Sequence, residues 1–201
     1  MRAGLVLPQR RGLLAAATLW LVAGPSTPTQ AGAAPTGRVL PRQPAPTLHV
    51  IGVDGLHMPL PMALAGEATA VQLMFTGCSS VCPVQGAVFA AVAPRLPSGA
   101  GRLLSISIDA LGDTPASMAA WQGRLGPHPA WLAAVGDAAD VDQIGRFMTG
   151  GNGKPGTHTA QVFVFDREAR LCYRTGDAPS PDEILALLAV ASTSDASVPG
   201  G

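Results

Sequence analysis

The chain has 201 residues, of which 47% are hydrophobic and 13% charged, and its 13 basic and 13 acidic side chains give a formal net charge of zero. This composition is sufficient for one buried core with extensions at its ends. With no basic run and no net positive charge, the chain does not have the features of a nucleic-acid binder.

The first 33 residues are typical of an export signal. Three arginines precede a short apolar run over residues 12–24, and Ala31-Gly32-Ala33 follows as a small-residue cleavage site. The run is shorter than the roughly 20 residues that span a bilayer, so we expect cleavage, with an uncleaved anchor as the alternative. The rest of the chain is then periplasmic or otherwise exported, and membrane association is expected only through this segment.

The residues that flank the predicted domain have a different composition. Residues 34–47 contain four prolines among small residues, which predicts an extended linker. Residues 192–201 are rich in serine, glycine and proline and predict a flexible tail. One domain over residues 48–191 remains between them.

Strand-like and helix-like segments alternate along this domain. Residues 48–51 and 56–58 flank Val53-Asp54-Gly55 and predict a β-hairpin. Short apolar runs over 70–75, 103–108 and 161–165 predict buried strands, and a turn over 166–169 leads into a further strand over 171–174. Helices are predicted over 83–95, from a Thr114 cap with Pro115 following, from Asp137 to near Gly150, and from the Ser180 capping box to 190.

This alternation predicts the fold class. Strands separated by helices favour a mostly parallel central sheet with helices on both faces. The last hairpin and helix add antiparallel strands at one edge. We therefore predict an α/β, thioredoxin-like fold, in which a central mixed sheet is flanked by helices and preceded by an N-terminal β-hairpin.

Two of the three cysteines lie between a predicted strand and a predicted helix, in Thr76-Gly77-Cys78-Ser79-Ser80-Val81-Cys82-Pro83. Pro83 fits the first turn of a helix, where a missing N–H is tolerated. The N–H groups and the dipole at a helix start favour thiolate, which attacks disulfides and also binds soft metals. Exported proteins form disulfides, but one that closes so short a loop removes little chain entropy, so stabilisation alone explains this pair poorly.

A histidine ligand would distinguish metal binding from disulfide exchange. His158 lies in a glycine-rich loop before a predicted core strand, at the same end of the sheet as the cysteines. The other histidines fit surface, core-edge or loop positions: His49, His57 and His128. Two thiolates and one imidazole suit a soft cation, with copper(I) the best fit and zinc allowed by ligand type alone.

Three blocks of sequence resemble the SCO/SenC family of exported, thioredoxin-like copper proteins linked to cytochrome c oxidase assembly. Residues 75–83 are similar to the family's T-x-C-x-x-x-C-P, and residues 107–115 to its S-x-D-P-x-x-D-T-P. Residues 157–166 are similar to its H-S/T followed by a strand that ends in Asp. The resemblance extends over about residues 45–190.

The resemblance implies a copper site formed by Cys78, Cys82 and His158. Asp109 and Asp113 match acidic positions near the family's site. For Asp113 we favour a helix-capping role beside Thr114, and for Asp109 a polar role near the site.

The chain also departs from the family pattern. Ser79-Ser80 stands where the family often has Pro-Asp, and Ala110 replaces a common proline. Losing the carboxylate beside the thiols should make thiolate easier to form. Cys172 is not part of the family's site, and its strand context predicts a buried free thiol.

Three functions follow as hypotheses. The first is a metallochaperone, which is not an enzyme, that binds copper and passes it to a protein such as a cytochrome oxidase subunit; its cysteines must be kept reduced by a thiol–disulfide reductant. The second is a thiol–disulfide oxidoreductase in which Cys78 attacks and Cys82 resolves. A peroxiredoxin-like peroxidase ranks last, because no arginine neighbours the pair in sequence.

Overall fold

The computed structural model describes residues 35–151 and 159–193. The predicted export signal, His158 and residues 194–201 of the predicted tail lie outside these ranges. Within them, no helix has the length and apolar character needed to cross a membrane.

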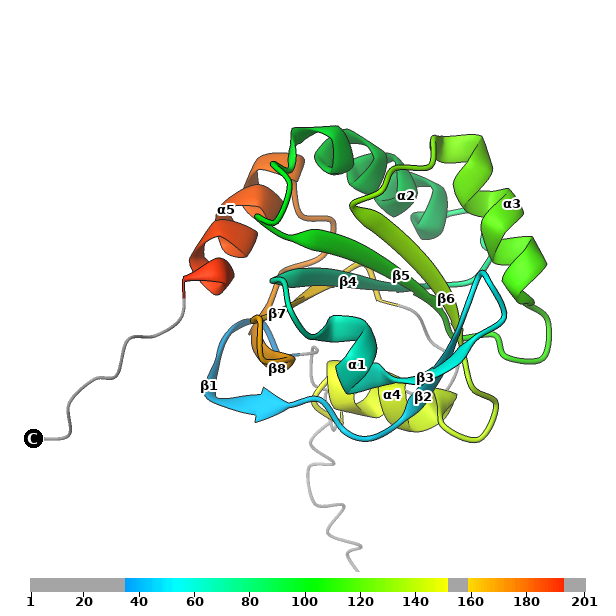
Figure 1. Cartoon of the computed structure of the whole chain (residues 1–201), viewed down its shortest axis with the longest axis horizontal. Helices are drawn as coiled ribbons and strands as arrows, with labels where there is room; N and C mark the ends of the chain where they lie inside the picture. The colour runs from blue at the N-terminus through cyan, green and yellow to red at the C-terminus, as the bar shows by residue number, and fades with distance from the viewer. Residues whose placement is uncertain (1–34, 152–158, 194–201) are drawn as a thin grey trace, which may run out of the picture. The chain divides into compact units, whose positions relative to one another are not determined.

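A single mixed sheet runs through the domain, with the strand order β1-β8-β7-β4-β5-β6-β2-β3 (Figure 1). β4, β5 and β6 are parallel, and the pairings on either side of them are antiparallel. The prediction of a mixed sheet is confirmed, but antiparallel strands lie at both edges rather than at one. The strands are β1 (Gly37–Pro44), β2 (His49–Gly52), β3 (His57–Pro59), β4 (Thr69–Met74), β5 (Arg102–Ser107), β6 (Trp131–Gly136), β7 (Val162–Phe165) and β8 (Arg170–Arg174).

Helices cover both faces of the sheet, as Figure 1 shows. One face carries α2 (Val81–Val92), which continues as the short 3-10 helix η1 (Ala93–Arg95), together with α3 (Pro115–Leu125) and α5 (Pro181–Ser192). The other face carries α1 (Leu60–Leu64) and α4 (Val141–Met148). The sheet therefore has a buried apolar layer on each side.

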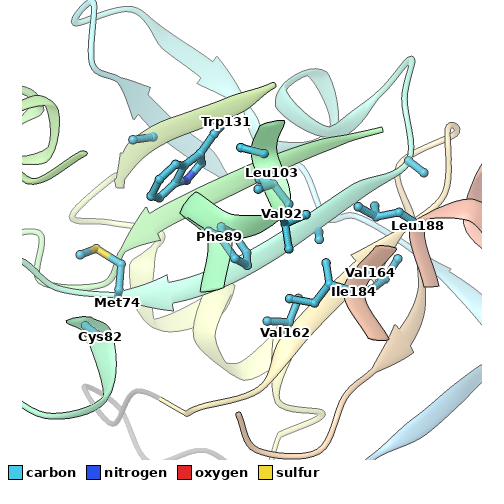
Figure 2. Close-up of a cluster of buried hydrophobic side chains, with 14 of the residues drawn as sticks. Met74, Cys82, Phe89, Val92, Leu103, Trp131, Val162, Val164, Ile184 and Leu188 are labelled. Carbon is cyan, nitrogen blue, oxygen red and sulfur yellow. The ribbon is translucent and has the colours of Figure 1, made fainter. Parts of the chain in front are cut away.

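The period of two along β4 assigns its side chains to these two layers. Ala70 and Met74 pack in the layer under α2, while Val71 and Leu73 pack in the opposite layer. Figure 2 shows the first layer, where Phe89 of α2 lies against the sheet. Its ring meets that of Trp131 edge-on, with centroids 6.0 Å apart. The backbone of the cysteine-bearing helix is thus anchored on a dense aromatic core.

The expectation of an unpacked linker over residues 34–47 is wrong for residues 37–44. These residues form β1, an edge strand that pairs antiparallel with β8. The register shifts between Arg38 and Gln43, and Pro41 lies within that shift. A proline is tolerated there because an edge strand with an interrupted ladder does not need every N–H.

Several element boundaries and caps can be compared with the sequence. The hairpin of β2 and β3 is confirmed. The predicted cap of α3 is confirmed as well, because the Thr114 hydroxyl accepts from Ser117 N at 3.1 Å. α4 begins at Val141 instead of Asp137, which lies in the preceding turn and accepts from the Val141 N–H. α2 begins at Val81, two residues before the predicted start, so Cys82 lies inside its first turn.

Candidate functional site

The loop that carries Cys78 joins the carboxyl end of β4 to α2. Cys78 N donates to Phe75 O at 3.1 Å, which turns the chain directly after the strand. Ser80 is the N-cap residue of α2, yet its side chain makes no capping hydrogen bond. Instead, Cys82 N donates to the Cys78 sulfur at 3.4 Å. The sulfur of Cys78 thus accepts one of the backbone N–H groups that a helix start leaves unsatisfied.

The pKa values of the two thiols are shifted in opposite directions. Burial of the half-buried Cys78 acts to raise its pKa, but hydrogen bonds from the Cys82 side chain and backbone and from Ser80 outweigh burial and lower that pKa to about 6. Burial raises the pKa of the fully buried Cys82 to about 12, and the neighbouring Cys78 contributes in the same direction. At pH 7 the thiolate is therefore the main form of Cys78, while Cys82 keeps its proton.

This asymmetry sets what the pair can do. The half-buried Cys78 thiolate is a nucleophile and a soft ligand at neutral pH. Cys82 serves as a second sulfur ligand only when a metal displaces its proton, because metal-bound cysteine is deprotonated. The same arrangement suits an attacking thiolate with a buried resolving thiol.

Asp113 fixes the cysteine loop to its surroundings. Its carboxylate accepts from Thr76 N at 2.8 Å and from the Thr76 hydroxyl, from the Ser107 hydroxyl at 2.5 Å and from the Ser117 hydroxyl at 3.3 Å. The predicted capping role for Asp113 is wrong, because Thr114 is the N-cap of α3 and Asp113 turns inward towards Thr76. The helix-cap pattern in the sequence does not predict that the Asp113 side chain points inward.

Asp109 shapes the turn that leads to Asp113. Its carboxylate accepts from Gly112 N at 2.9 Å, and its carbonyl accepts from Asp113 N at 2.8 Å. The apex of this turn is Leu111, whose side chain is 96% exposed. The polar role expected for Asp109 is thus a local one, which holds the turn beside the cysteine loop.

The described histidines contact other groups. His49 Nδ1 lies 2.9 Å from Asp140 Oδ2, and His57 Nδ1 lies 3.5 Å from Asp137 Oδ2. His128 Nδ1 accepts from Ala130 N. Residues 35–151 and 159–193 contain no group of three or more His, Cys, Asp or Glu side chains arranged for a metal. The predicted third ligand, His158, lies outside these ranges, so the set of Cys78, Cys82 and His158 stays a prediction.

A buried amide pair links α2 to the start of β7. Gln85 Nε2 donates to Gln161 O at 3.4 Å. Both residues are buried, with exposures of 3% for Gln85 and 2% for Gln161. Gln161 Nε2 donates to Thr175 O at 2.8 Å. Gln85 follows Cys82 by one helical turn, and Gln161 follows His158 by three residues in sequence. The sequence does not predict this link, since a glutamine on a helix gives no sign of its partner.

Cys172 lies on β8, apart from the loop that carries the cysteine pair. Its thiol is half-buried rather than fully buried as predicted, and it donates to Val164 O at 3.2 Å. Burial raises its pKa to about 11, against the opposing effect of the Arg42 charge. As predicted, the thiol is free, and it stays protonated at neutral pH.

Comparisons with known proteins give a consistent family. A family model described as SCO1/SenC matches residues 61–192, well over half of the chain. No curated protein sequence matches the chain. Among solved structures, the chain is similar to yeast Sco1 with copper bound, with 19% identity over 77% of this chain and 92% of that chain and a TM-score of 0.62.

Two further structures are similar at the same level. BsSco, described as a member of the Sco family of cytochrome c oxidase assembly proteins with a disulfide switch, has 16% identity over 76% of this chain and 96% of its own, and a TM-score of 0.61. A SCO1/SenC family lipoprotein from Bacillus anthracis has 18% identity over 76% of this chain and 96% of its own, and a TM-score of 0.62. These similarities confirm the predicted thioredoxin-like fold.

Proposed function

The chain belongs to the SCO1/SenC family, and from this premise we propose that it is an exported copper-binding metallochaperone. It holds copper through Cys78, Cys82 and His158 and delivers it to a respiratory oxidase, such as a cytochrome oxidase subunit, or to a similar copper protein. Yeast Sco1, whose fold this chain shares, is described with copper bound.

The observation that carries the proposal is the unequal pair of sulfurs at the start of α2. Cys78 is a half-buried thiolate near neutral pH, and its sulfur accepts from Cys82 N at 3.4 Å, so the two cysteines are already in contact. Soft thiolate ligands select copper(I), and an imidazole completes a three-ligand set. Binding displaces the proton of Cys82, so loading releases protons and becomes tighter as the pH rises.

The surroundings of the pair support transfer to another protein. Ligand exchange requires the recipient to reach the metal directly, so its surface must cover the cysteine loop. Two exposed apolar side chains belong to the segments around this loop. Val84, two residues after Cys82, is 58% exposed, and Leu111, two residues before the Asp113 that contacts the loop, is 96% exposed. A protein surface of low charge density fits such a rim, because charged groups are depleted where interfaces are fully buried.

Export and redox state complete the proposal. Residues 1–33 direct the chain to the periplasm or another exported location, and any membrane anchoring goes through this segment. The cysteines bind copper only when reduced, so a thiol–disulfide reductant is the second partner.

An anaerobic copper(I) titration of the reduced chain tests this function. We expect one tightly bound copper per chain, and loss of tight binding in C78S, C82S and H158A. The matched controls C172S and H128A replace a cysteine and a histidine outside the proposed ligand set and should bind as the unsubstituted chain does. Absence of tight binding by the unsubstituted chain would exclude the metallochaperone function.

One alternative function has support from the same pair. A thiol–disulfide oxidoreductase needs an exposed attacking thiolate and a buried resolving thiol, which Cys78 and Cys82 resemble in their acidities. This function does not need His158. Disulfide exchange that survives in H158A, in a chain that does not bind copper, would favour it.

A further inference from the structure

Asp113 has an unusual set of partners for a buried carboxylate. Asp113 is only 7% exposed, and its carboxylate accepts hydrogen bonds from three different segments of the chain. Thr76 comes from the cysteine loop, Ser107 from the end of β5 and Ser117 from the first turn of α3. All of these donors are neutral N–H or hydroxyl groups.

Thr76 and Ser107 supply three of these hydrogen bonds, and the Ser117 hydroxyl, at 3.3 Å, shares its one proton with Thr114 O at 2.9 Å. An ionised carboxylate has about four acceptor positions, and hydrogen bonds to an ionised acceptor are roughly twice as strong as neutral ones. Burying such a charge is unfavourable unless its hydrogen bonds are made. α3 already has its cap from Thr114, so capping does not account for the presence of a buried carboxylate here.

Thr76 is the donor that matters for the functional site. It gives both its N–H and its hydroxyl to Asp113, and it lies two residues before Cys78. The rest of the loop is held by the Cys78 N–H to Phe75 O and by the Cys82 N–H to the Cys78 sulfur. Without Asp113, Thr76 loses its link to Ser107 and Ser117, whereas Met74 O still accepts from Ile108 N at 2.9 Å.

We infer that Asp113 is a positioning residue for the copper site, which acts through Thr76 to fix the cysteine loop and thereby the placement of the Cys78 sulfur relative to Cys82. The inference rests on the proposed copper function but concerns a residue outside the ligand set. Outer partners that orient metal ligands typically change metal affinity by about 10–100-fold when they are replaced.

The test compares donors to the same carboxylate. T76V removes the hydroxyl donor on the side of the cysteine loop, and S117A removes a hydroxyl donor on the side of α3 together with the hydrogen bond from Thr114 N to that hydroxyl. We expect T76V to weaken copper(I) binding about tenfold, measured by competition with a copper(I) chelator, and S117A to change it less than about twofold. Thermal unfolding of both variants, followed in parallel, separates an effect on the site from a loss of stability.

A second pair of measurements examines Asp113 itself. D113N keeps the shape but leaves one acceptor oxygen for all the donors, so it should weaken copper(I) binding at least as much as T76V. The double variant T76V/D113N should bind copper(I) no more weakly than D113N alone, because both changes disrupt one shared contact. If D113N does not fold, T76V and S117A still decide the question.

A metal-free readout distinguishes this inference from the proposed function. The equilibrium of the Cys78–Cys82 disulfide with mixtures of reduced and oxidised dithiothreitol depends on the same placement of the sulfurs. We expect T76V to shift it up to tenfold towards the dithiol, which corresponds to about 30 mV. Failure of the unsubstituted chain to bind copper(I) would reject the proposed function and leave this measurement to test Asp113.

Two results would overturn the inference. One is a folded T76V chain with the copper affinity and the disulfide equilibrium of the unsubstituted chain. The other is an S117A chain that loses affinity as much as T76V, which would show that the carboxylate serves only the general stability of this end of the fold.

Discussion

The two halves of α2 are held in place by different forces. Its first turn is fixed by directional hydrogen bonds, from Cys82 N to the Cys78 sulfur and, through the preceding loop, from Thr76 to Asp113. Its middle is fixed by close apolar packing around Phe89. The difference indicates that the thiolate of Cys78 is set by a few polar contacts, while the helix is held by an apolar cluster that includes Phe89 and the buried Cys82.

Gly86 shows how tight the packed half is. A Cβ at this position would lie 2.6 Å from Leu125 Cδ1 and 2.9 Å from Trp121 Cζ2, so only glycine allows α3 to approach this closely. Trp121 in turn meets Trp131 edge-on, with centroids 5.7 Å apart. In the first turn only Cys82 is buried in this cluster, whereas Cys78 and Ser80 in the preceding loop are at least partly exposed.

The largest expected effect lies in the polar half and concerns the reactivities of the two thiols. With pKa values of about 6 and about 12, Cys78 should be alkylated at least about a hundredfold faster than Cys82 at pH 7, because only the thiolate reacts and its larger fraction in Cys78 outweighs its lower intrinsic nucleophilicity. The Cys78 rate should rise with pH around a midpoint near 6, as its proton is lost. Labelling of the reduced chain, followed by peptide mass, measures both rates.

Denaturant supplies the control for this labelling. In the unfolded chain the hydrogen bonds to Cys78 are gone, so its midpoint should return towards the ordinary value of 9.0. Equal rates for the two cysteines in the folded chain would contradict the assignment of a thiolate and a buried thiol, and with it the role of the polar contacts.

The next effect lies in the packed half. F89A removes a fully buried ring under α2 and should lower the free energy of unfolding by about 3–5 kcal/mol, the range for large-to-small changes in cores. F89L should cost about 1 kcal/mol. Urea unfolding measures both, and V84A, on the exposed side of the same helix, should stay within about 0.5 kcal/mol of the unsubstituted chain.

The comparison also predicts what F89L leaves unchanged. Because Phe89 lies in the core and not in the cysteine loop, the folded F89L chain should keep the copper(I) affinity of the unsubstituted chain. A loss comparable to that expected for T76V would mean that the packed half also sets the site, and the division between the halves would fail.

Sequence patterns predicted the elements whose signals are local. The Thr114 cap, the β2–β3 hairpin and the placement of the cysteines between strand and helix all depend on neighbouring residues. β6 was missed because its run of Trp, Leu, Ala and Val is too short and too rich in alanine to separate a strand from a helix by periodicity. The prolines of residues 37–44 predict a linker instead of β1, because the partner strand β8 lies more than a hundred residues further along the chain.

The same distinction holds within the site. The positions of Cys78 and Cys82 follow from the local pattern, whereas the contacts of Asp113 with Thr76 and of Gln85 with Gln161 join residues 37 and 76 positions apart. Such long-range polar pairs leave no periodicity or cap signal in a single sequence. The contribution of the structure is therefore the set of groups that hold the cysteines, more than the cysteines themselves.

The smallest predicted effect tests whether Ser80 acts on the pKa of Cys78 or on the stability of the first turn of α2. Ser80 Oγ lies 3.8 Å from the Cys78 sulfur and contributes to lowering its pKa, but it makes no capping hydrogen bond. S80A should therefore raise the labelling midpoint of Cys78 by a fraction of a pH unit and change the free energy of unfolding by less than about 0.5 kcal/mol, below the usual cost of losing a cap. S79A, one residue earlier in the loop, is the matched control for the midpoint. A stability loss of a full cap in S80A would show that this hydroxyl, and not the Cys78 sulfur, satisfies the first turn of α2.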